Sequence, residues 1–535
     1  MSIRISNLRT SLDEPEASLA HRAVGLLGIS ESELAHWRIL RKSLDTRKKG
    51  SLRFVYTLEA ALKGDEARVI QLAPKAGHEG VRLELYHAPN FEMPAAGNRV
   101  LDHRPIIIGS GPAGLVAAYF LAERGYRPLV LERGRSVRDR IQDVLAFDSG
   151  GPLDAESNYL FGEGGAGTFS DGKLTCRSSG PDVRRVLELF AECKGKPSIL
   201  YEYRPHLGSN RLPAVVKAIR RKIETLGGEL RFSCRAEDLD ITDGRLRGVA
   251  TSSGYILANI AFLATGHSAR DTYAMLERRG VPMVQKPFQM GVRIEQPQEA
   301  VNRAQYGLSR LEEKLGAADY SLVAHGRYNL FTFCMCAGGR IIPSVSAPGY
   351  FSTNGMSLST RASPFANSGL MITIEPSQFG NSDILAGMHL QEAYEKKAFE
   401  AGRGEYLCPI QMAADFLARR PTRHMPPCSY ERGLVLHSIN ELIPPMIVDA
   451  LDHGLPIMDR RWSGRFLANA TLVGPEARGS SPVRIVRDDA TREMPGIEGL
   501  YPIGEGAGYA GGIISAAVDG LRSAKAVVAK YAPLT

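Results

Sequence analysis

Three glycines in GxGxxG spacing, Gly109, Gly111 and Gly114, follow the apolar run III at 106–108 and open an apolar helix pattern. Each glycine has its own predicted task. Gly109 permits a tight turn, Gly111 lets the backbone approach a pyrophosphate, and Gly114 lets helix and strand pack closely. Free N–H groups and the dipole at the start of the helix favour an anion there. The spacing therefore predicts a dinucleotide site.

An acidic residue, Glu132, ends the second apolar strand of this pattern, 23 residues after Gly109. In dinucleotide-binding folds an acid at this place accepts hydrogen bonds from ribose hydroxyls, and it disfavours a ribose 2′-phosphate. Glu132 alone does not separate FAD from NAD.

A second glycine-rich stretch, GEGGAGTFSDGKL at 162–174, distinguishes between these two cofactors. FAD carries a ribityl chain and an isoalloxazine ring that must pass the edge of the sheet, whereas a dehydrogenase that uses only NAD has no need of such a loop. We expect the N–H groups of Gly164, Gly165 and Gly167 to approach phosphate or flavin. Three side chains are expected to add polar contacts: Thr168, Ser170 and Lys173. The alternative is a glycine-rich loop at the surface.

The C-terminal stretch IGEGAGYAGGI at 503–513 supplies the third part of the predicted site. Glu505 could accept hydrogen bonds from the ribityl hydroxyls. The N–H groups near Gly512 and Ile513 could stabilise negative charge at the N1–C2=O2 edge of a reduced flavin.

The elements around these stretches predict a parallel sheet. Residues 104–134 give strand, glycine turn, helix and strand, with apolar strands typical of a sheet buried on both faces. The last seventy residues return to strand, glycine loop and helix, whereas the pattern at 286–465 is mixed. We therefore predict an α/β chain of three domains. A small N-terminal α+β (βαββ-like) domain spans 1–95, and a discontinuous Rossmann-like FAD-binding domain spans 100–285 and 466–535. An α+β cap domain for substrate is inserted at 286–465.

Composition sets further bounds. The 535 residues exceed the size at which one core usually stops growing. The net charge of +8 is mild for this length, and the basic stretch RKSLDTRKKG at 41–50 lacks interleaved aromatic residues, so we favour a solvated surface over nucleic-acid binding. The seven cysteines form no CxxC pair, which gives no support to a metal or iron–sulfur site. Because neither a signal-peptide h-region nor a bilayer-spanning run is evident, we expect a soluble cytoplasmic protein.

Several residues away from the glycines could do chemistry. Cys334 and Cys336 would share one face of a regular strand. Their Cα atoms would then be roughly 6.5–7 Å apart, too far for a relaxed disulfide. We therefore interpret them as small buried hydrophobic residues rather than a redox pair. The catalytic candidates are Glu295, Glu476 and Arg478, and further residues that could bind substrate or transfer a proton are Arg293, His325 and Arg327.

In combination, these motifs resemble the glutathione-reductase-like class of FAD proteins and, more narrowly, the bacterial family of uncharacterised FAD-dependent dehydrogenases. The class-level motifs are GSGPAG, Glu132-Arg133, GEGGAGTFSDGKL, Ala264-Thr265-Gly266 and IGEGAGYAGGI. The family-level motifs are RKSLDTRKKGSLRFVYT, GVRIEQPQEAVNRAQYG, YNLFTFCMCAGGRIIPS, TNGMS and RGSSPVRI. One departure is AGGR at 337–340, where the resemblance predicts a proline with acidic or small residues. This change and the apolar-leaning STRASPFANSG indicate a reshaped substrate pocket.

The resemblance implies the fold and FAD but no particular substrate. With it, the residues expected to bind the cofactor are Gly109, Ser110, Gly111, Pro112, Ala113, Gly114, Glu132, Arg133, Gly164, Gly165, Gly167, Thr168, Lys173, Ala236, Thr265, Gly266, Gly504, Glu505, Gly512 and Ile513.

The sequence thus predicts an FAD-dependent oxidoreductase that exchanges a hydride between flavin N5 and a small organic substrate bound between the cap and FAD-binding domains. NADH or NADPH could serve as a transient electron donor, and no oligomeric state is assigned. Two alternatives stay open. One is a flavin-dependent RNA-modifying enzyme, in which Arg47, Lys48 and Lys49 would contact RNA. The other is a non-catalytic FAD-binding protein.

Overall fold

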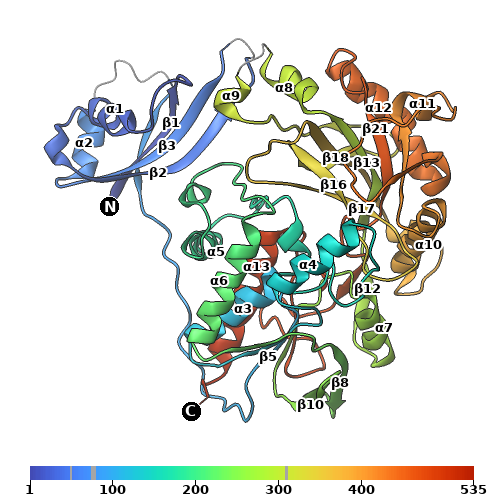
Figure 1. The fold of residues 1–535 in the computed structure, drawn as a ribbon. Helices are drawn as coiled ribbons and strands as arrows, with labels where there is room; N and C mark the ends of the chain where they lie inside the picture. The colour runs from blue at the N-terminus through green and yellow to red at the C-terminus, as the bar shows by residue number, and fades with distance from the viewer. Residues whose placement is uncertain (49–50, 74–79, 308–310, 535) are drawn as a thin grey trace.

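The computed structural model describes residues 1–48, 51–73, 80–307 and 311–534. Figure 1 shows an N-terminal lobe at the upper left, a Rossmann-like part below and a large mixed unit at the upper right. Lys49, one of the basic residues in the stretch 41–50, lies outside the described residues.

The N-terminal lobe is a four-stranded antiparallel sheet in the order β2-β3-β1-β4, packed against helices. Its elements are β1 (Ser2–Thr10), α1 (Ser18–Leu27), β2 (Leu34–Asp45), β3 (Arg53–Leu62), α2 (Glu66–Leu72) and β4 (Arg82–Tyr86). The βαββ prediction is therefore incomplete, since α2 and β4 extend the unit to βαββαβ. The side chain of Asp65 starts α2 by accepting from the N–H groups of Ala67 and Arg68.

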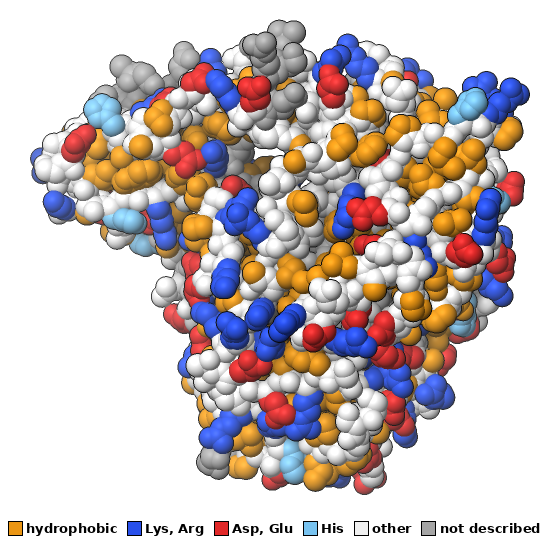
Figure 2. All heavy atoms as spheres, viewed as in Figure 1, with side chains coloured by type: hydrophobic (Ala, Val, Ile, Leu, Met, Phe, Trp, Pro, Cys, Tyr) orange, Lys and Arg blue, Asp and Glu red, His pale blue; other side chains and the backbone are white. Residues whose placement is uncertain are grey.

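Strand β2 also attaches this lobe to the Rossmann-like part. The N–H of Lys42 donates to the Tyr201 carbonyl at 2.7 Å, and the N–H of Tyr203 donates back to the Lys42 carbonyl at 2.8 Å. The Lys42 ammonium pairs with Glu16 at 2.6 Å, and the Arg41 guanidinium lies 4.2 Å from the centre of the Tyr203 ring. These two basic residues of the stretch 41–50 therefore have protein partners. Figure 2 shows acidic and basic side chains interspersed over the face in view.

The Rossmann-like part is confirmed, and it is discontinuous. Five parallel strands lie in the order β23-β11-β5-β6-β7, the doubly wound order with β5 as its first strand. The strands are β5 (Ile106–Ile108), β6 (Leu129–Leu131), β7 (Glu229–Arg231), β11 (Ala261–Leu263) and β23 (Leu500–Pro502). The helices are α3 (Pro112–Glu123), α4 (Val137–Asp148), α5 (Pro181–Glu192), α6 (Leu212–Thr225) and α13 (Ile513–Lys530). An antiparallel sheet adds β8 (Ala236–Thr242), β9 (Arg245–Thr251) and β10 (Gly254–Leu257).

The central helix α3 is buried on every side from Ala113 to Ala122. It packs against the sheet and against α6 and α13. The approach of α13 depends on Gly520, where a Cβ would lie 2.1 Å from the Ala113 carbonyl oxygen. The continuous apolar run of α3 therefore reflects burial between layers rather than one amphipathic face.

The third unit is built on a seven-stranded mixed sheet in the order β14-β15-β18-β13-β21-β19-β20. Its strands are β13 (Phe288–Pro297), β14 (Val323–Ala324), β15 (Leu330–Cys336), β18 (Phe365–Ile374), β19 (Cys408–Met412), β20 (Leu434–Leu436) and β21 (Thr471–Glu476). A hairpin of β16 (Gly339–Pro343) and β17 (Thr353–Ser357) lies beside it. The helices are α8 (Gln298–Tyr306), α9 (Glu312–Leu315), α10 (Ala386–Ala401), α11 (Ala413–Leu417) and α12 (Pro445–Arg461).

The junction between the two larger units differs from the predicted boundary. Strand β21 pairs with β13 and β19, so the sheet of the cap extends beyond the boundary predicted at residue 465. The chain then returns through β22 (Val483–Ile485), which pairs with β12 (Met283–Gln285), and helix α7 (Arg270–Arg278) precedes this pair. Across the described ranges, no helix combines the length and apolarity needed to cross a membrane.

Candidate functional site

The first part of the site lies where the strand order of the parallel sheet reverses. Strands β5 and β11 are neighbours there, and ligands of doubly wound folds bind beyond the carboxyl ends of the strands at such a switch point. The glycine turn follows β5, and residues 264–267 follow β11. A Cβ at Gly109 would lie 2.5 Å from the Ala264 carbonyl oxygen, so these two chain segments touch.

The three glycines of the turn differ in what surrounds them. Gly109 has a φ of +107°, a conformation that favours glycine. A Cβ at Gly114 would lie 2.0 Å from the Gly109 carbonyl oxygen, so only glycine lets α3 start this close to the turn. At Gly111, by contrast, a Cβ would meet no atom within 4 Å. The open space at Gly111, at the N-terminus of α3, fits a pyrophosphate.

The second glycine-rich stretch packs directly on the first. The N–H of Gly164 donates to the Ser110 carbonyl at 3.0 Å, and a Cβ at Gly165 would come within 3.1 Å of the Gly111 Cα. The N–H of Gly165 donates to the Gly162 carbonyl at 2.8 Å. The expectation that the N–H groups of Gly164 and Gly165 are free for a ligand is therefore wrong, because both are used within the chain. The stretch instead packs against the turn at Gly109–Gly114 and stabilises it.

The side chains that follow this stretch are also engaged by the protein. Thr168, in a short 3₁₀ helix over Gly165–Phe169, donates its hydroxyl to the Glu163 carbonyl at 2.9 Å. The hydroxyl of Ser170 donates to the Gly167 carbonyl at 2.8 Å. The ammonium of Lys173 is turned toward the cap, where it donates to the Met335 carbonyl. The predicted polar contacts of Thr168 and Lys173 to a cofactor are thus replaced by protein contacts.

Glu132 binds backbone N–H groups of both glycine-rich turns through its side chain. Its buried carboxylate accepts from the Ser110 hydroxyl at 2.6 Å, the Ser110 N–H at 3.0 Å, the Gly134 N–H at 2.9 Å and the Gly162 N–H at 3.0 Å. Four donors match the acceptor capacity of a carboxylate. The predicted hydrogen bonds to ribose would have to displace one of them, so the clamp on the two turns is the role that the geometry supports.

We expect Glu132→Gln to destabilise the protein by about 1–3 kcal/mol even without any cofactor. The amide nitrogen cannot accept hydrogen bonds, so N–H groups of Ser110, Gly134 or Gly162 would be left buried without an acceptor. Urea unfolding of flavin-free protein measures the effect. Unchanged stability of the flavin-free variant would contradict the clamp, whatever the variant does to cofactor binding.

The opposite side of the switch point also has room for a polar ligand. A Cβ at Gly266 would meet no atom within 4 Å, and Gly266 has a φ of +72°. Next to it, the Nδ1 of His267 lies 2.6 Å from a carboxylate oxygen of Glu505. The other ring nitrogen, Nε2, is buried and has no hydrogen-bond partner within the described chain. An unpartnered buried nitrogen beside an open glycine fits a ligand with polar groups.

Two helix N-termini meet below the second glycine-rich stretch. A Cβ at Gly167 would lie 3.3 Å from Pro112 at the start of α3 and 3.5 Å from Ile513 at the start of α13. The N–H of Gly512 donates to the Ser515 hydroxyl at 3.0 Å. The sequence predicted that this N–H would be available to a flavin, whereas the structure shows it bound within the chain. The turn before α13 is held at Gly504, whose N–H donates to the buried Asp519 carboxylate at 2.8 Å.

Two further predicted cofactor residues, Arg133 and Ala236, make contacts within the protein. The Arg133 guanidinium donates to Glu156 at 2.8 Å and to Asp271 at 3.0 Å, and it lies 4.1 Å from the centre of the Phe161 ring. Ala236 starts β8 and is paired with Thr251. Arg133 therefore has protein partners for its charge, and Ala236 packs against the buried cluster that includes Leu239 and Val249.

A second group of polar residues lies on the cap sheet and faces the loop that carries Lys173. Arg293 on β13 is fully buried and forms a two-pronged ion pair with Glu476 on β21, at 2.7 and 2.8 Å. The guanidinium also donates to the side-chain oxygens of Asn367 at 2.7 Å and Asn354 at 3.2 Å. Burial raises the pKa of Glu476 to about 7, although the Arg293 charge acts in the opposite direction.

On the loop that carries Lys173 and faces the cap sheet, Asp171 makes most of the polar contacts. Its carboxylate lies 2.8 Å from the Lys173 ammonium and 3.5 Å from the ring of His206, and it accepts from the hydroxyl of Ser357 on β17. The charge of Lys173 and the contact with His206 hold the pKa of Asp171 well below its usual range, although burial raises it. Cap and Rossmann-like part are thus joined by a network that is charged at neutral pH.

Arg478, a predicted catalytic candidate, belongs to a different buried cluster. Its guanidinium and that of Arg270 both bind the carboxylate of Glu395 on α10, at distances of 2.8–2.9 Å. Arg478 also donates to the hydroxyls of Ser346 and Ser268 at 2.6 and 3.1 Å. Arg270 and Ser268 follow β11 whereas Glu395 and Ser346 lie in the cap, so Arg478 joins the two units. A catalytic role for Arg478 stays a prediction.

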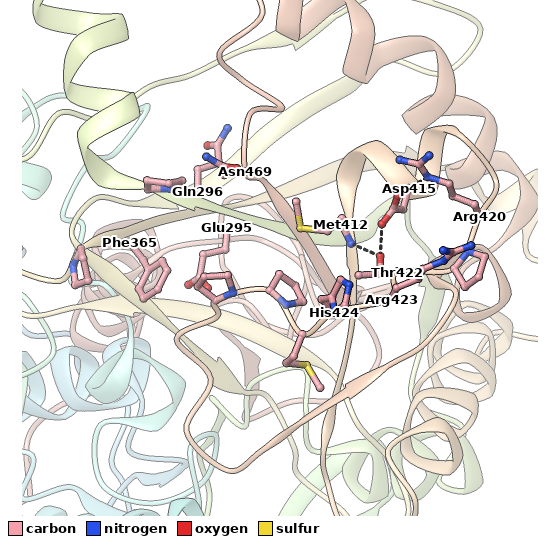
Figure 3. A pocket seen from close by; sticks show the side chains of 16 residues that line it. Glu295, Gln296, Phe365, Met412, Asp415, Arg420, Thr422, Arg423, His424 and Asn469 are labelled. Carbon is pink, nitrogen blue, oxygen red and sulfur yellow. Dashed lines mark hydrogen bonds and ion pairs between the residues drawn. The ribbon is translucent and has the colours of Figure 1, made fainter.

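The cap contains a cavity of about 790 Å³ at the end of β13, within the size range of ligand pockets. Figure 3 shows Glu295, Phe365, Met412 and His424 around it. Its lining includes residues of β13, β18, β19 and the segment 420–427, so no single stretch of sequence encodes the cavity. Phe365, in the stretch STRASPFANSG that was expected to reshape a substrate pocket, is one of the lining residues. None of the predicted cofactor residues lines it.

Glu295, at the wall of this cavity, is a buried carboxyl held by a loop. It accepts from the Ser429 N–H at 2.8 Å and from the Ser429 hydroxyl, and burial raises its pKa. Of the other candidates, His325 and Arg327 are exposed near the end of β14, and the structure gives neither a place in the buried clusters.

Comparison with known proteins agrees with this fold. Residues 287–479 match the domain family described as FAD-dependent protein, C-terminal domain-like, and residues 107–165 match an NAD(P)-binding Rossmann-like domain. Residues 2–61 match a domain of unknown function. An uncharacterised protein of Clostridium beijerinckii is 38% identical over 536 residues, which cover 99% of each chain.

The chain belongs to the FAD-dependent protein family. The cofactor is FAD, and the open space at Gly111 is where its pyrophosphate fits. The FAD-dependent domain puts this chain among the flavin oxidoreductases. Among solved structures, glycine oxidase from Geobacillus kaustophilus is similar at 12% identity and a TM-score of 0.36, covering 81% of this chain and 96% of that one. L-proline dehydrogenase from P. horikoshii is similar at 12% identity and a TM-score of 0.33, covering 80% and 93%. Neither likeness carries an argument about substrate.

Proposed function

We propose that this FAD-dependent protein exchanges a hydride with a small organic substrate held where the cap sheet meets the loop that carries Asp171 and Lys173. The observation that carries the proposal is the buried Arg293–Glu476 pair with its surrounding amides. A buried ion pair contributes little net stability, whereas ionisable groups with shifted pKa values cluster at functional sites. When bound, FAD would supply hydride exchange at N5 of its ring.

The chain's own residues would bind and orient the substrate. The side-chain nitrogen of Asn367 is buried and has no partner in the described part of the chain, so it could donate to a substrate oxygen. Glu476, with a pKa near neutrality, could take up or release a proton at its carboxylate oxygens. Arg293 would fix the orientation of that carboxylate through its two parallel hydrogen bonds.

We further propose that the cap cavity holds the part of the substrate that does not react. Arg293 and Glu295 are two residues apart on β13 and therefore share a face of the strand. Glu295 lines the cavity, which therefore begins about one strand repeat from the Arg293–Glu476 pair.

FAD itself would be held by the turn around Gly111, the N-termini of α3 and α13 and the segment Gly266–His267. We expect purified protein to show a flavin spectrum, and anaerobic addition of NADH and then NADPH tests the electron donor. Bleaching by either would indicate a nicotinamide-driven reductase or oxygenase, and no bleaching would indicate a dehydrogenase or oxidase acting on its substrate. Absence of a flavin spectrum even after reconstitution with FAD would contradict the proposal.

Glu476 gives a second test, once a donor or substrate that reduces the flavin is in hand. We expect the rate of flavin reduction in the wild type to change with an inflection near pH 7, and Glu476→Gln to lower the rate about 10²-fold and remove the inflection. Arg303→Gln, at an exposed pair with Glu299, is the control and should keep the profile. A wild-type profile without an inflection near pH 7 would rule out Glu476 as the proton carrier.

A further inference from the structure

The stretch Cys334-Met335-Cys336 at the end of β15 is not a regular strand. Its register with β18 shifts between Phe333 and Cys336, and Cys334 has a φ of +45°. Such a conformation is rare for a residue with a side chain and is found where the surrounding structure enforces it, often at functional sites. The expectation of a regular strand, on which the predicted separation of the two Cα atoms rested, is therefore wrong.

The Cys336 thiol turns back onto residue 334 at this bulge. It donates a hydrogen bond to the Cys334 carbonyl oxygen at 3.2 Å. Cys336 is fully buried, whereas Cys334 is half-buried. Of the two residues, Cys334 is thus the one with solvent-exposed surface.

The surroundings of Cys334 favour the thiolate. Together, the hydrogen bond from Cys336 and the positive charges of Lys173 and Arg293 outweigh burial and lower the pKa of Cys334 to about 6. The charged and titratable groups that face the pair are Lys173 and Asp171 from the loop, Arg293 from β13, Glu476 from β21 and the buried Tyr320 that precedes β14. Burial raises the pKa of Cys336 well above its usual value, so this thiol stays protonated.

We propose that Cys334 and Cys336 form a redox-active dithiol that reduces small disulfides, with Cys334 as the attacking sulfur and Cys336 as the resolving sulfur. The Cys334 thiolate attacks one sulfur of a disulfide RS–SR, breaks the S–S bond and expels RS⁻, leaving a mixed disulfide. RS⁻ takes the Cys336 proton. The new Cys336 thiolate attacks the Cys334 sulfur and expels the second RS⁻, which is protonated by solvent. The protein dithiol loses two electrons to the disulfide, which becomes two thiols. This inference does not depend on the flavin reaction.

The test uses the purified flavoprotein with glutathione disulfide as the probe. Peptide mass spectrometry should show the 334–336 peptide lighter by two hydrogens, with full reversal by dithiothreitol. Cys336→Ser should stop at a glutathione adduct on Cys334, and Cys334→Ser should not react at Cys336. Cys408→Ser, at a buried cysteine of β19, is the matched control and should behave as the wild type. A wild-type protein whose 334–336 peptide is unchanged, or keeps a glutathione adduct, would overturn the proposal.

A second readout is the pH dependence of alkylation by iodoacetamide. The rate at Cys334 should be half-maximal near pH 6, against an ordinary value near 8.5 for a free cysteine. Lys173→Met should raise the midpoint by about one pH unit, so that alkylation at pH 6 falls several-fold. A midpoint near 8.5 in the wild type would show that the thiolate is not stabilised and would overturn the assignment of Cys334 as the attacking sulfur.

Discussion

Gly111→Val is expected to abolish FAD binding and to leave the fold intact. Gly111 has a φ of −67°, which any residue adopts, and a Cβ there would meet no protein atom within 4 Å. The side chain would instead fill the space where the pyrophosphate approaches the backbone at the start of α3. We expect the affinity for FAD to fall at least about a hundredfold, equivalent to about 2.7 kcal/mol. Flavin absorbance after reconstitution measures the loss, and urea unfolding of flavin-free protein should match the wild type.

Two other glycines supply the controls. Gly25→Ala, in α1, also adds a Cβ that meets nothing within 4 Å, and it should keep FAD binding unchanged. Gly114→Ala adds a Cβ only 2.0 Å from the Gly109 carbonyl oxygen and should lower the stability of the flavin-free protein itself. A Gly111→Val protein that keeps one flavin per chain would refute the placement of the pyrophosphate.

Glu395→Ala is expected to produce the largest loss of stability. The carboxylate holds the guanidinium groups of Arg270 and Arg478 at 2.8–2.9 Å, and all three side chains are largely buried. Removing it takes the shared carboxylate from two buried like charges and leaves Arg270 only the longer pair with Glu392 at 3.7 Å, which costs about 3–5 kcal/mol. Urea unfolding measures the loss. Glu299→Gln, at an exposed i,i+4 pair with Arg303, should change stability by less than about 0.5 kcal/mol.

The same cluster predicts a pH dependence. Burial raises the pKa of Glu395, but the two guanidinium groups overcome this effect and lower it to about 2. Since the unfolded chain has a pKa of about 4.3 for Glu, the ionised pair stabilises the fold fully above that pH, and the contribution is lost as the pH falls toward 2. The difference in unfolding free energy between wild type and Glu395→Gln should shrink over this window. A difference that stays constant between pH 5 and pH 2 would contradict the role of the charge.

The sequence by itself determined those parts of the protein whose structure depends only on residues close together along the chain. The turn at Gly109–Gly114, the apolar strands beside it and the return to the sheet at 500–513 are local patterns, because each residue type is required by its own backbone conformation or by burial of one short segment. These patterns suffice to predict the discontinuous Rossmann-like part and FAD. The separate tasks of Gly109, Gly111 and Gly114 also follow from spacing, and the space around each glycine agrees with them.

Tertiary structure decided what each polar side chain does. Glu132, Thr168 and Lys173 have the types and positions of cofactor ligands, but their hydrogen-bonding groups are taken up by partners that only the folded chain brings near. Arg478 joins Glu395 across 83 residues, and Arg293 joins Glu476 across 183. Such pairings carry no periodic signal in the sequence.

The bulge at Cys334 and the cavity beside Glu295 were decided in the same way. A strand pattern gives alternating faces but not the register shift between Phe333 and Cys336, because that shift depends on the pairing with β18. The cavity arises where β13 and β19 end and β18 begins, near the segment 420–427. The sequence therefore specifies the cofactor, whereas packing between distant segments specifies where chemistry can occur beside it.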